Sequence, residues 1–303
     1  MRSCRVFFLK KLFSLLLFFS VPAIVYGESG GYTADELRIP DSNQLQILTT
    51  PGGSRLIGRI IKIRATEIDF KTDLGIQTIA IGLIKEIEEI PVSLIKEGEY
   101  WFPNPNTTRL FFAPTGRMMK KGQGYFCDYY LFFPGVAWGI TDNLTIGLGI
   151  SLFPWLDFAE QIIYFTPKLG VAASRNVRFA TGALIVTIPD WNNDDESHTV
   201  GILYGVSTLG SDDHNFTAGL GYGFADGELA DKPMVMFGGE FRIARRAAFV
   251  TENWIFPELD NPLISYGVRF FGEALSVDLA LVTVTGEDAI VPGIPYIDFV
   301  FNF

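Results

Sequence analysis

Apolar and polar residues alternate in several stretches of the chain after residue 107. In residues 144–153 every second residue is Leu or Ile, and the residues between them are Thr, Gly, Ser or Phe. Residues 215–224 repeat this pattern, with large apolar residues on one face and Asn, Thr or Gly on the other. A period of two residues predicts β-strands. Bulky residues on one face and small ones on the other are typical of a barrel standing in lipid, since a soluble sandwich usually exposes Lys, Glu and Thr.

Extended over residues 107–303, the alternation predicts an antiparallel barrel of about twelve strands. Short turns such as Thr141–Asn143 alternate with longer connections such as 189–198, so the two rims differ. Pro134 and Pro167 each remove a backbone donor inside a strand, and we expect bulges there. The expected strands are 107–115, 125–140, 144–153, 160–172, 177–188, 199–209, 214–224, 233–243, 247–256, 263–271, 275–284 and 295–303.

The C-terminal strand carries the most specific feature of this region. Ile297, Phe299, Phe301 and Phe303 fall on one face and end the chain with an aromatic residue. Residues 107–303 thus resemble an outer-membrane β-barrel protein of a Gram-negative bacterium. The resemblance implies that these four residues are an assembly signal, read by the barrel-assembly machinery and periplasmic chaperones. It also implies that the barrel is surrounded by outer-membrane lipid, and we expect its last strand to pair with 107–115.

Charged residues within the strands are expected to face the lumen, because a charge facing lipid near the midplane costs about 2–4 kcal/mol. Two interpretations stay open. The charges line a narrow, porin-like channel for ions or small solutes, or they pair across the lumen and lock a non-conducting barrel that anchors the N-terminal domain for a protein partner. The expected lumen-lining residues are Arg109, Asp128, Lys168, Glu240, Arg242, Glu252, Arg269, Asp278 and Asp298.

The first 27 residues predict a secretory signal peptide that is cleaved on export. They combine four basic residues, an apolar run of 14 residues and a small-residue end at Gly27. The run is shorter than the roughly 18 residues that a membrane-spanning helix needs. Cleavage leaves 20 basic and 34 acidic residues, a net charge of -14. Such acidity disfavours nucleic acid as a partner.

Residues 45–95 differ in composition from the barrel region and predict a small all-β domain. Short β-branched runs are separated by turns at 51–53 and 73–75, with Gly58 inside a strand. The spacing of glycines and isoleucines resembles the SH3-like or Sm-like barrels. With export, this resemblance implies a periplasmic domain that could hold a protein partner. Residues 28–44 and the proline-containing stretch 96–106 are interpreted as linkers.

The sequence predicts no catalytic, cofactor or metal site. His198 and His214 fall on opposite rims, so neither pairs with a nucleophile as an acyl-transfer site requires. The acidic loop that includes residues 190–196 has oxygen ligands suited to calcium but lacks the spacing of an EF-hand loop, and we interpret it as solvated. The sequence therefore predicts a non-enzymatic outer-membrane barrel preceded by a small periplasmic β domain.

Overall fold

The computed structural model describes residues 31–189, 197–257, 259–286 and 290–303. These residues form two compact units, of which the first ends at Tyr100 and the second begins at Trp101. The predicted signal peptide and the acidic stretch 190–196 lie outside the described residues. Among the described residues, no helix has the length and apolar character needed to cross a membrane.

The first unit is built on an antiparallel sheet of five strands in the order β4-β3-β2-β1-β5. Three short 3-10 helices and a two-stranded ribbon accompany it. The elements are η1 (Ala34–Glu36), β1 (Gln44–Thr49), β2 (Arg55–Ile63), β3 (Glu67–Thr72), β4 (Gly75–Ala80), η2 (Ile81–Leu83), β5 (Glu86–Pro91), η3 (Val92–Leu94), β6 (Ile95–Lys96) and β7 (Glu99–Tyr100).

The core of this unit lies against one face of the sheet. Leu48, Ile60 and Phe70 are fully buried in it. At Gly58 a β-carbon would stand 2.2 Å from the carbonyl oxygen of Lys71, so no side chain fits where β2 passes β3. The predicted all-β character of this region is confirmed, whereas its resemblance to the SH3-like barrels stays a prediction.

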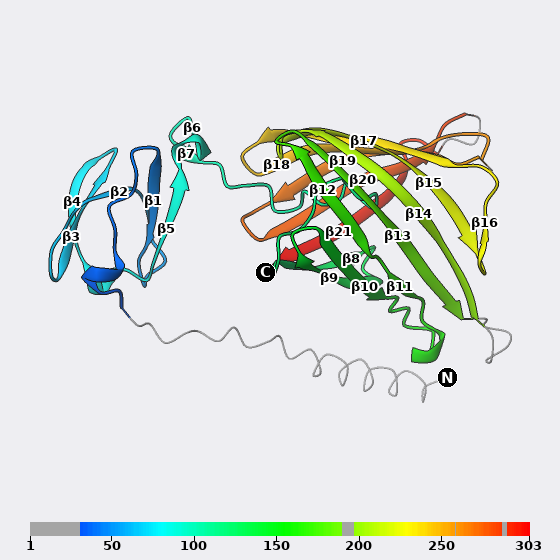
Figure 1. Ribbon diagram of the computed structural model, residues 1–303, viewed down its shortest axis with the longest axis horizontal. Coiled ribbons are helices and arrows are strands. Elements are labelled where there is room, and N and C mark those ends of the chain that lie inside the picture. Colours follow the sequence, from blue (N-terminus) through cyan, green and yellow to red (C-terminus); the bar gives the residue numbers. More distant parts are fainter. Residues whose placement is uncertain (1–30, 190–196, 258, 287–289) are drawn as a thin grey trace. The chain divides into compact units, whose positions relative to one another are not determined.

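The second unit is a closed antiparallel barrel of twelve strands (Figure 1). β11 and β12 are two segments of one strand between β10 and β13, β16 extends a hairpin, and β21 closes the barrel by pairing with β8. The elements are β8 (Gly124–Tyr129), β9 (Phe133–Thr141), β10 (Leu144–Ile150), η4 (Phe158–Glu160), β11 (Ile163–Phe165), β12 (Lys168–Ser174), β13 (Val177–Pro189), β14 (Ser197–Gly210), β15 (His214–Ala225), β16 (Glu228–Leu229), β17 (Met234–Ala244), β18 (Ala247–Ile255), β19 (Leu263–Phe271), β20 (Leu275–Val284) and β21 (Ile294–Asn302).

The predicted twelve-stranded barrel is confirmed, but two of the predicted strands were wrong. Residues 107–115 form no barrel strand and instead lie inside the lumen. Residues 125–140 are a hairpin of two strands, because the chain reverses at Tyr130 and Leu131, which have positive φ angles of 55° and 65°. The two errors cancel in the strand count. The C-terminal strand accordingly pairs with β8 and not with residues 107–115.

The outer face of the barrel carries large apolar side chains on many of its strands. Large side chains on it are well exposed in many strands, including Leu148, Leu169, Phe179, Leu203, Phe216, Leu220, Phe237, Phe249, Phe270, Leu279 and Phe301. A soluble domain would hide such a surface, whereas a barrel in lipid requires it. The second unit therefore has the architecture of an outer-membrane barrel.

The two predicted bulges have different outcomes. Pro167 does interrupt its strand, dividing β11 from β12, while Thr166 still exchanges backbone hydrogen bonds with Gly147 at 2.8 and 3.1 Å. At Pro134 the expectation was wrong, because β8 and β9 stay in register through the pair Asp128 and Pro134. Pro134 lies at the beginning of its strand, where a missing donor disturbs little of the ladder.

A charge on the outer face should destabilise the barrel according to its depth. We expect Leu220→Arg, in the middle of β15, to lower the free energy of unfolding by about 2–4 kcal/mol. Ile243→Arg, next to the last residue of β17, is the control and should cost about 0–1 kcal/mol because it lies near the rim. Urea unfolding of the protein folded into lipid vesicles measures both. Equal effects of the two variants would contradict a lipid-facing surface.

Candidate functional site: the inner segment and the lumen pocket

Residues 101–123, here called the inner segment, enter the barrel and leave it at the rim of short turns. At the entrance, Arg242 donates a hydrogen bond to the carbonyl oxygen of Phe102 at 3.0 Å, and its guanidinium lies 5.0 Å from the ring centroid of Trp101. At the exit, the N–H of Gly122 donates to the carbonyl oxygen of Gly139 at 2.9 Å. The segment therefore loops into the lumen and back.

The innermost part of the loop is a tight turn held by one carboxylate. The N–H of Leu110 donates to the carbonyl oxygen of Ala113 at 2.8 Å and closes the turn. The three successive N–H groups of residues 111–113 all donate to Oε2 of Glu252 at 2.9 Å. Glu252 is 1% exposed and takes its remaining hydrogen bond from the Trp254 indole at 2.8 Å. These bonds fasten the tip of the segment to β18.

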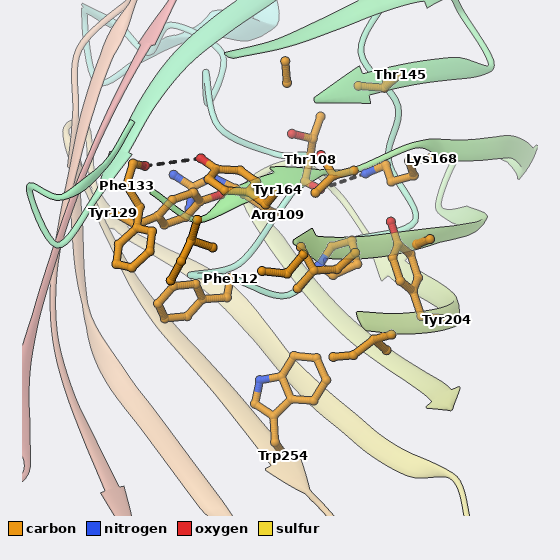
Figure 2. A pocket seen from close by; sticks show the side chains of 18 of the residues that line it. Thr108, Arg109, Phe112, Tyr129, Phe133, Thr145, Tyr164, Lys168, Tyr204 and Trp254 are labelled. Carbon is orange, nitrogen blue, oxygen red and sulfur yellow. Dashed lines mark hydrogen bonds between the residues drawn. The ribbon is translucent and has the colours of Figure 1, made fainter. Parts of the chain in front are cut away.

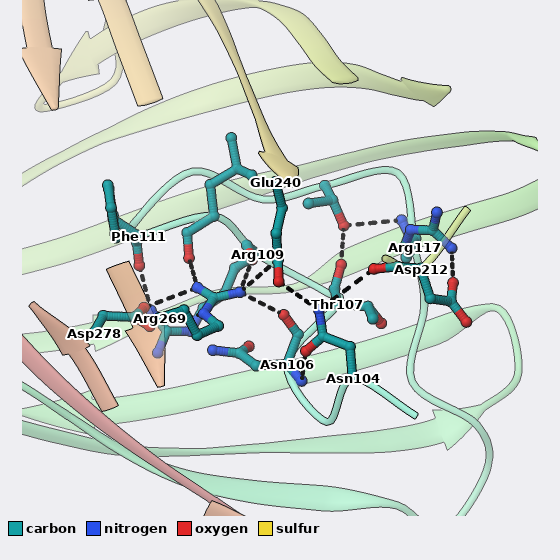
Figure 3. A network of polar contacts seen from close by, with 12 residues as sticks. Asn104, Asn106, Thr107, Arg109, Phe111, Arg117, Asp212, Glu240, Arg269 and Asp278 are labelled. Atoms are coloured by element: carbon teal, nitrogen blue, oxygen red, sulfur yellow. Dashed lines mark hydrogen bonds and ion pairs between the residues drawn. The ribbon is translucent and has the colours of Figure 1, made fainter. Parts of the chain in front are cut away.

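Arg269 in β19 joins the inner segment to three barrel strands (Figure 3). Its guanidinium binds both carboxylate oxygens of Asp278 at 2.7 and 2.8 Å and Oε2 of Glu240 at 2.9 Å. It also donates to the carbonyl oxygens of Asn106 at 2.7 Å and Leu110 at 2.6 Å. Arg269 is 0% exposed, so a full set of partners is what makes its burial tolerable.

Two arginines of the segment itself form further ion pairs with the barrel. Arg109 binds the buried carboxylate of Asp298 and lies 4.7 Å from the ring centroid of Tyr129. Arg117 binds Asp212 in the turn between β14 and β15, and donates to the carbonyl oxygen of Ser211 at 2.6 Å. The segment is thus held by charges at its tip, its middle and the rim.

Apolar contacts between the inner segment and the barrel strands fill the lumen around the ion pairs. Leu110, Phe111 and Ala113 belong to one buried cluster with side chains of the surrounding strands. These side chains are Ala180 in β13, Val206 in β14, Met236 in β17, Val250 in β18, Ala280 in β20 and Tyr296 in β21. Because these strands surround the lumen, the inner segment closes this part of it.

The structure brings most of the expected lumen residues together around the inner segment. Lys168, Glu240, Arg242, Glu252, Arg269, Asp278 and Asp298 all lie on barrel strands, with buried side chains that face the lumen. Arg109 is also buried in the lumen, although it lies on the inner segment and not on a strand. Their contacts are those of a network that holds the segment in place.

Asp128 departs from the expectation. It is paired in register with Phe299 and Pro134, so it lies on the outer face of β8, as Phe126 does. Its side chain is half-buried beside the turn at residues 130–132. A charge near the rim costs far less than one at the midplane, about 0–1 kcal/mol, which removes the reason for placing Asp128 in the lumen.

The C-terminal residues lie on the closing strand of the barrel. Phe301 and Phe303 are about half exposed on its outer face, as the alternation with the buried Asp298 and Val300 requires. The backbones of Phe303 and Gly124 exchange two hydrogen bonds of 2.9 Å, which complete the seam between β21 and β8. The phenyl ring of Phe303 also lies 5.6 Å from the Trp138 ring.

A pocket of about 570 Å³ lies in the lumen beside the inner segment (Figure 2). Several of its residues lie at strand ends toward the rim of long loops, among them Tyr129, Phe256 and Leu263. Aromatic and aliphatic side chains form most of the lining. The polar contributions come from Lys168, Thr145, several tyrosines and the inner segment itself. Pockets of this size and character usually hold a small, largely apolar ligand.

Sequence reasoning missed the inner segment, although one signal was present. Pro103, Pro105 and Pro114 lie within or close to the predicted strand 107–115. Proline is poorly tolerated in a strand that is paired on both sides. The local alternation of residues 109–113 outweighed this signal, because buried apolar residues on an irregular segment imitate a strand over so short a distance.

Comparisons with known proteins do not identify the chain. No protein-family model matches it. No curated protein sequence matches it either. Among solved structures, it is similar to the crystal structure of the toluene transporter TbuX from Ralstonia pickettii, with 10% sequence identity and a TM-score of 0.33 over 91% of this chain and 90% of that one. Because this likeness is so distant, the function has to be inferred from the lumen of the barrel itself.

Proposed function

We propose that the protein is an outer-membrane barrel that takes up a small, largely apolar solute and passes it inward when the inner segment moves. One observation carries the proposal. The lumen contains an apolar pocket directly beside the inner segment, and that segment is fastened by noncovalent contacts that can be broken. A lumen lined by charges alone would suit a permanent ion channel better.

Export and assembly belong to the same proposal. We propose that a signal peptide at residues 1–27 directs the chain to the periplasm and that the N-terminal unit stays there, available to a protein partner. Ile297, Phe299, Phe301 and Phe303 would act as the signal for the barrel-assembly machinery and periplasmic chaperones. Their position on the closing strand supports this role, because that strand completes the barrel.

A second candidate is a barrel that never opens and serves as an anchor for the N-terminal unit. The contacts of Arg269 favour it, since this guanidinium donates to two carboxylates and to carbonyl oxygens of the inner segment. Such a satisfied buried network resists opening. The apolar pocket has no role in an anchor, which is why we prefer the uptake function.

Uptake of an apolar probe by intact bacteria separates the two candidates. N-phenylnaphthylamine fluoresces in the cell envelope and is held back by the outer membrane. We expect expression of the protein in a bacterial host to raise the initial rate of its uptake. Ile202→Trp, which fills the pocket from β14, should return the rate to that of the host alone.

Leu203→Trp is the matched control. It makes the same substitution one residue further on, on the outer face, where Leu203 is 46% exposed. This variant should keep the raised rate. Uptake that is unchanged by expression of the wild-type protein, with the protein present in the outer membrane, would contradict the uptake function and favour the anchor.

A further inference from the structure

We infer that the lumen pocket binds an apolar monoanion, with a carboxylate held by Lys168, Thr145 and Tyr204 and a compact apolar body among the aromatic side chains. The inference rests on the proposed uptake function and names the class of solute. It starts from Lys168, whose side chain is buried at 7% exposure and lines the pocket.

Lys168 has only carbonyl oxygens as partners in the described part of the chain. Its ammonium donates to the carbonyl oxygens of Thr108 at 2.9 Å and Thr115 at 3.1 Å, both in the inner segment. Among the described residues no carboxylate forms an ion pair with it. An ammonium group has three donors, so one is left for a ligand. A buried cation without a counter-charge is costly, and an anion in the pocket would relieve that cost.

The hydroxyl group of Thr145, on the strand next to Lys168, supplies an independent observation. Thr145 is paired in register with Lys168, is 7% exposed and lines the pocket. Its hydroxyl is buried and has no hydrogen-bond partner among the described residues. Buried hydroxyl groups are almost always satisfied, and an unsatisfied one beside a ligand cavity indicates a bond completed by the ligand.

Tyr204 extends the row formed by Thr145 and Lys168 on the other side of Lys168. Lys168 is paired with Gly182, and Gly182 with Tyr204, across β12, β13 and β14. The Tyr204 hydroxyl lies 2.5 Å from the position of a β-carbon at Gly182, so the absence of a side chain there makes room for it. Figure 2 shows this hydroxyl pointing toward Lys168. The three groups are donors or can donate, as recognition of a carboxylate requires.

The rest of the pocket defines the body of the ligand. Phe112, Tyr129, Tyr164 and Trp254 contribute aromatic surface, and Leu184 and Ile202 contribute aliphatic surface. Arg109 also lines the pocket, but its charge is already paired with Asp298. A ligand with a single negative charge therefore fits better than a dianion, and an aromatic ring system fits better than a sugar.

Calorimetry with naphthoate and its neutral analogue naphthamide tests the inference on the full-length protein in lipid nanodiscs. We expect naphthoate to bind the wild-type protein at least about tenfold more tightly than naphthamide, the effect of one hydrogen bond to a charged group. Lys168→Met should remove this preference by weakening naphthoate binding far more than naphthamide binding. Lys121→Met, an exposed lysine of the short-turn rim, should alter neither.

Thr145→Val is a second variant, and a purely structural role of Thr145 would not account for its expected effect on binding. Removal of a buried hydroxyl without a partner should leave the stability of the protein unchanged or raised, while naphthoate binding weakens about tenfold. If Lys168→Met fails to fold, this variant decides the question. Equal binding of naphthoate and naphthamide to the wild-type protein, with both excluded by Ile202→Trp, overturns the anion preference alone. Failure of both to bind overturns the proposed uptake function as well.

Discussion

Replacement of residues 104–117 by eight Gly and Ser residues will convert a closed barrel into an open pore. The replaced residues carry the contacts to Glu252, Arg269 and Asp298 and the apolar side chains that fill the lumen. A flexible chain of eight residues can extend to about 26 Å and has nothing to hold it in the lumen. Since twelve strands enclose more space than lumen side chains fill, we expect the ion conductance in planar bilayers to rise at least about tenfold.

The conductance measurement needs a control variant in which Gly and Ser replace residues of the inner segment at the rim. Replacement of the exposed residues Lys120 and Lys121 by Gly and Ser leaves the contacts of the loop intact and should keep the conductance at the wild-type level. Equal currents through the wild-type protein and the variant lacking residues 104–117 would mean that the lumen is open around the inner segment.

Arg269→Met will cause the largest loss of stability among single substitutions in the lumen. It leaves the buried carboxylates of Glu240 and Asp278 without their cation and two carbonyl groups of the inner segment without a donor. Removal of one partner from a buried ion pair usually costs about 3–5 kcal/mol. Urea unfolding of the protein in lipid vesicles measures the change, with Arg246→Met in an exposed turn as the control.

Rescue of this variant distinguishes unpaired charge from lost packing. The triple variant Arg269→Met, Glu240→Gln, Asp278→Asn removes both buried negative charges together with the positive one. It should recover part of the lost stability, because neutral amides are less costly to bury than unpaired carboxylates. A stability of Arg269→Met close to that of Arg246→Met would show that the network does not hold the barrel and its inner segment together.

The outer surface of the barrel was predictable from the sequence because lipid imposes it. Each strand must place large apolar residues outward, so residues 144–153 and 215–224 reveal their faces without any knowledge of their neighbours. The charged lumen residues followed from the same rule, since Glu240, Arg269 and Asp278 lie on the opposite faces of their strands. Asp128 shows where this rule fails, because near a rim the cost of placing a charge on the outer face becomes small.

The interior was not predictable to the same degree. An inner segment is constrained by contacts with many strands, and those contacts have no period in the sequence. Residues 109–113 alternate like a short strand, but the chain reverses within them at the turn closed by Leu110 and Ala113. The sequence pattern over so few residues does not distinguish the two structures. The donor row of Thr145, Lys168 and Tyr204 depends on the registers of β10, β12, β13 and β14, and these are fixed by pairing rather than by composition.

Amide hydrogen exchange across residues 104–117 of the wild-type protein in nanodiscs tests most directly whether the inner segment fills the barrel. The N–H groups of residues 110–113 and of Gly116 are bonded to buried acceptors, so we predict that without a solute they exchange as slowly as those of the barrel strands. Complete exchange of these amides within seconds, while the strands stay protected, would contradict a lumen closed by the chain itself.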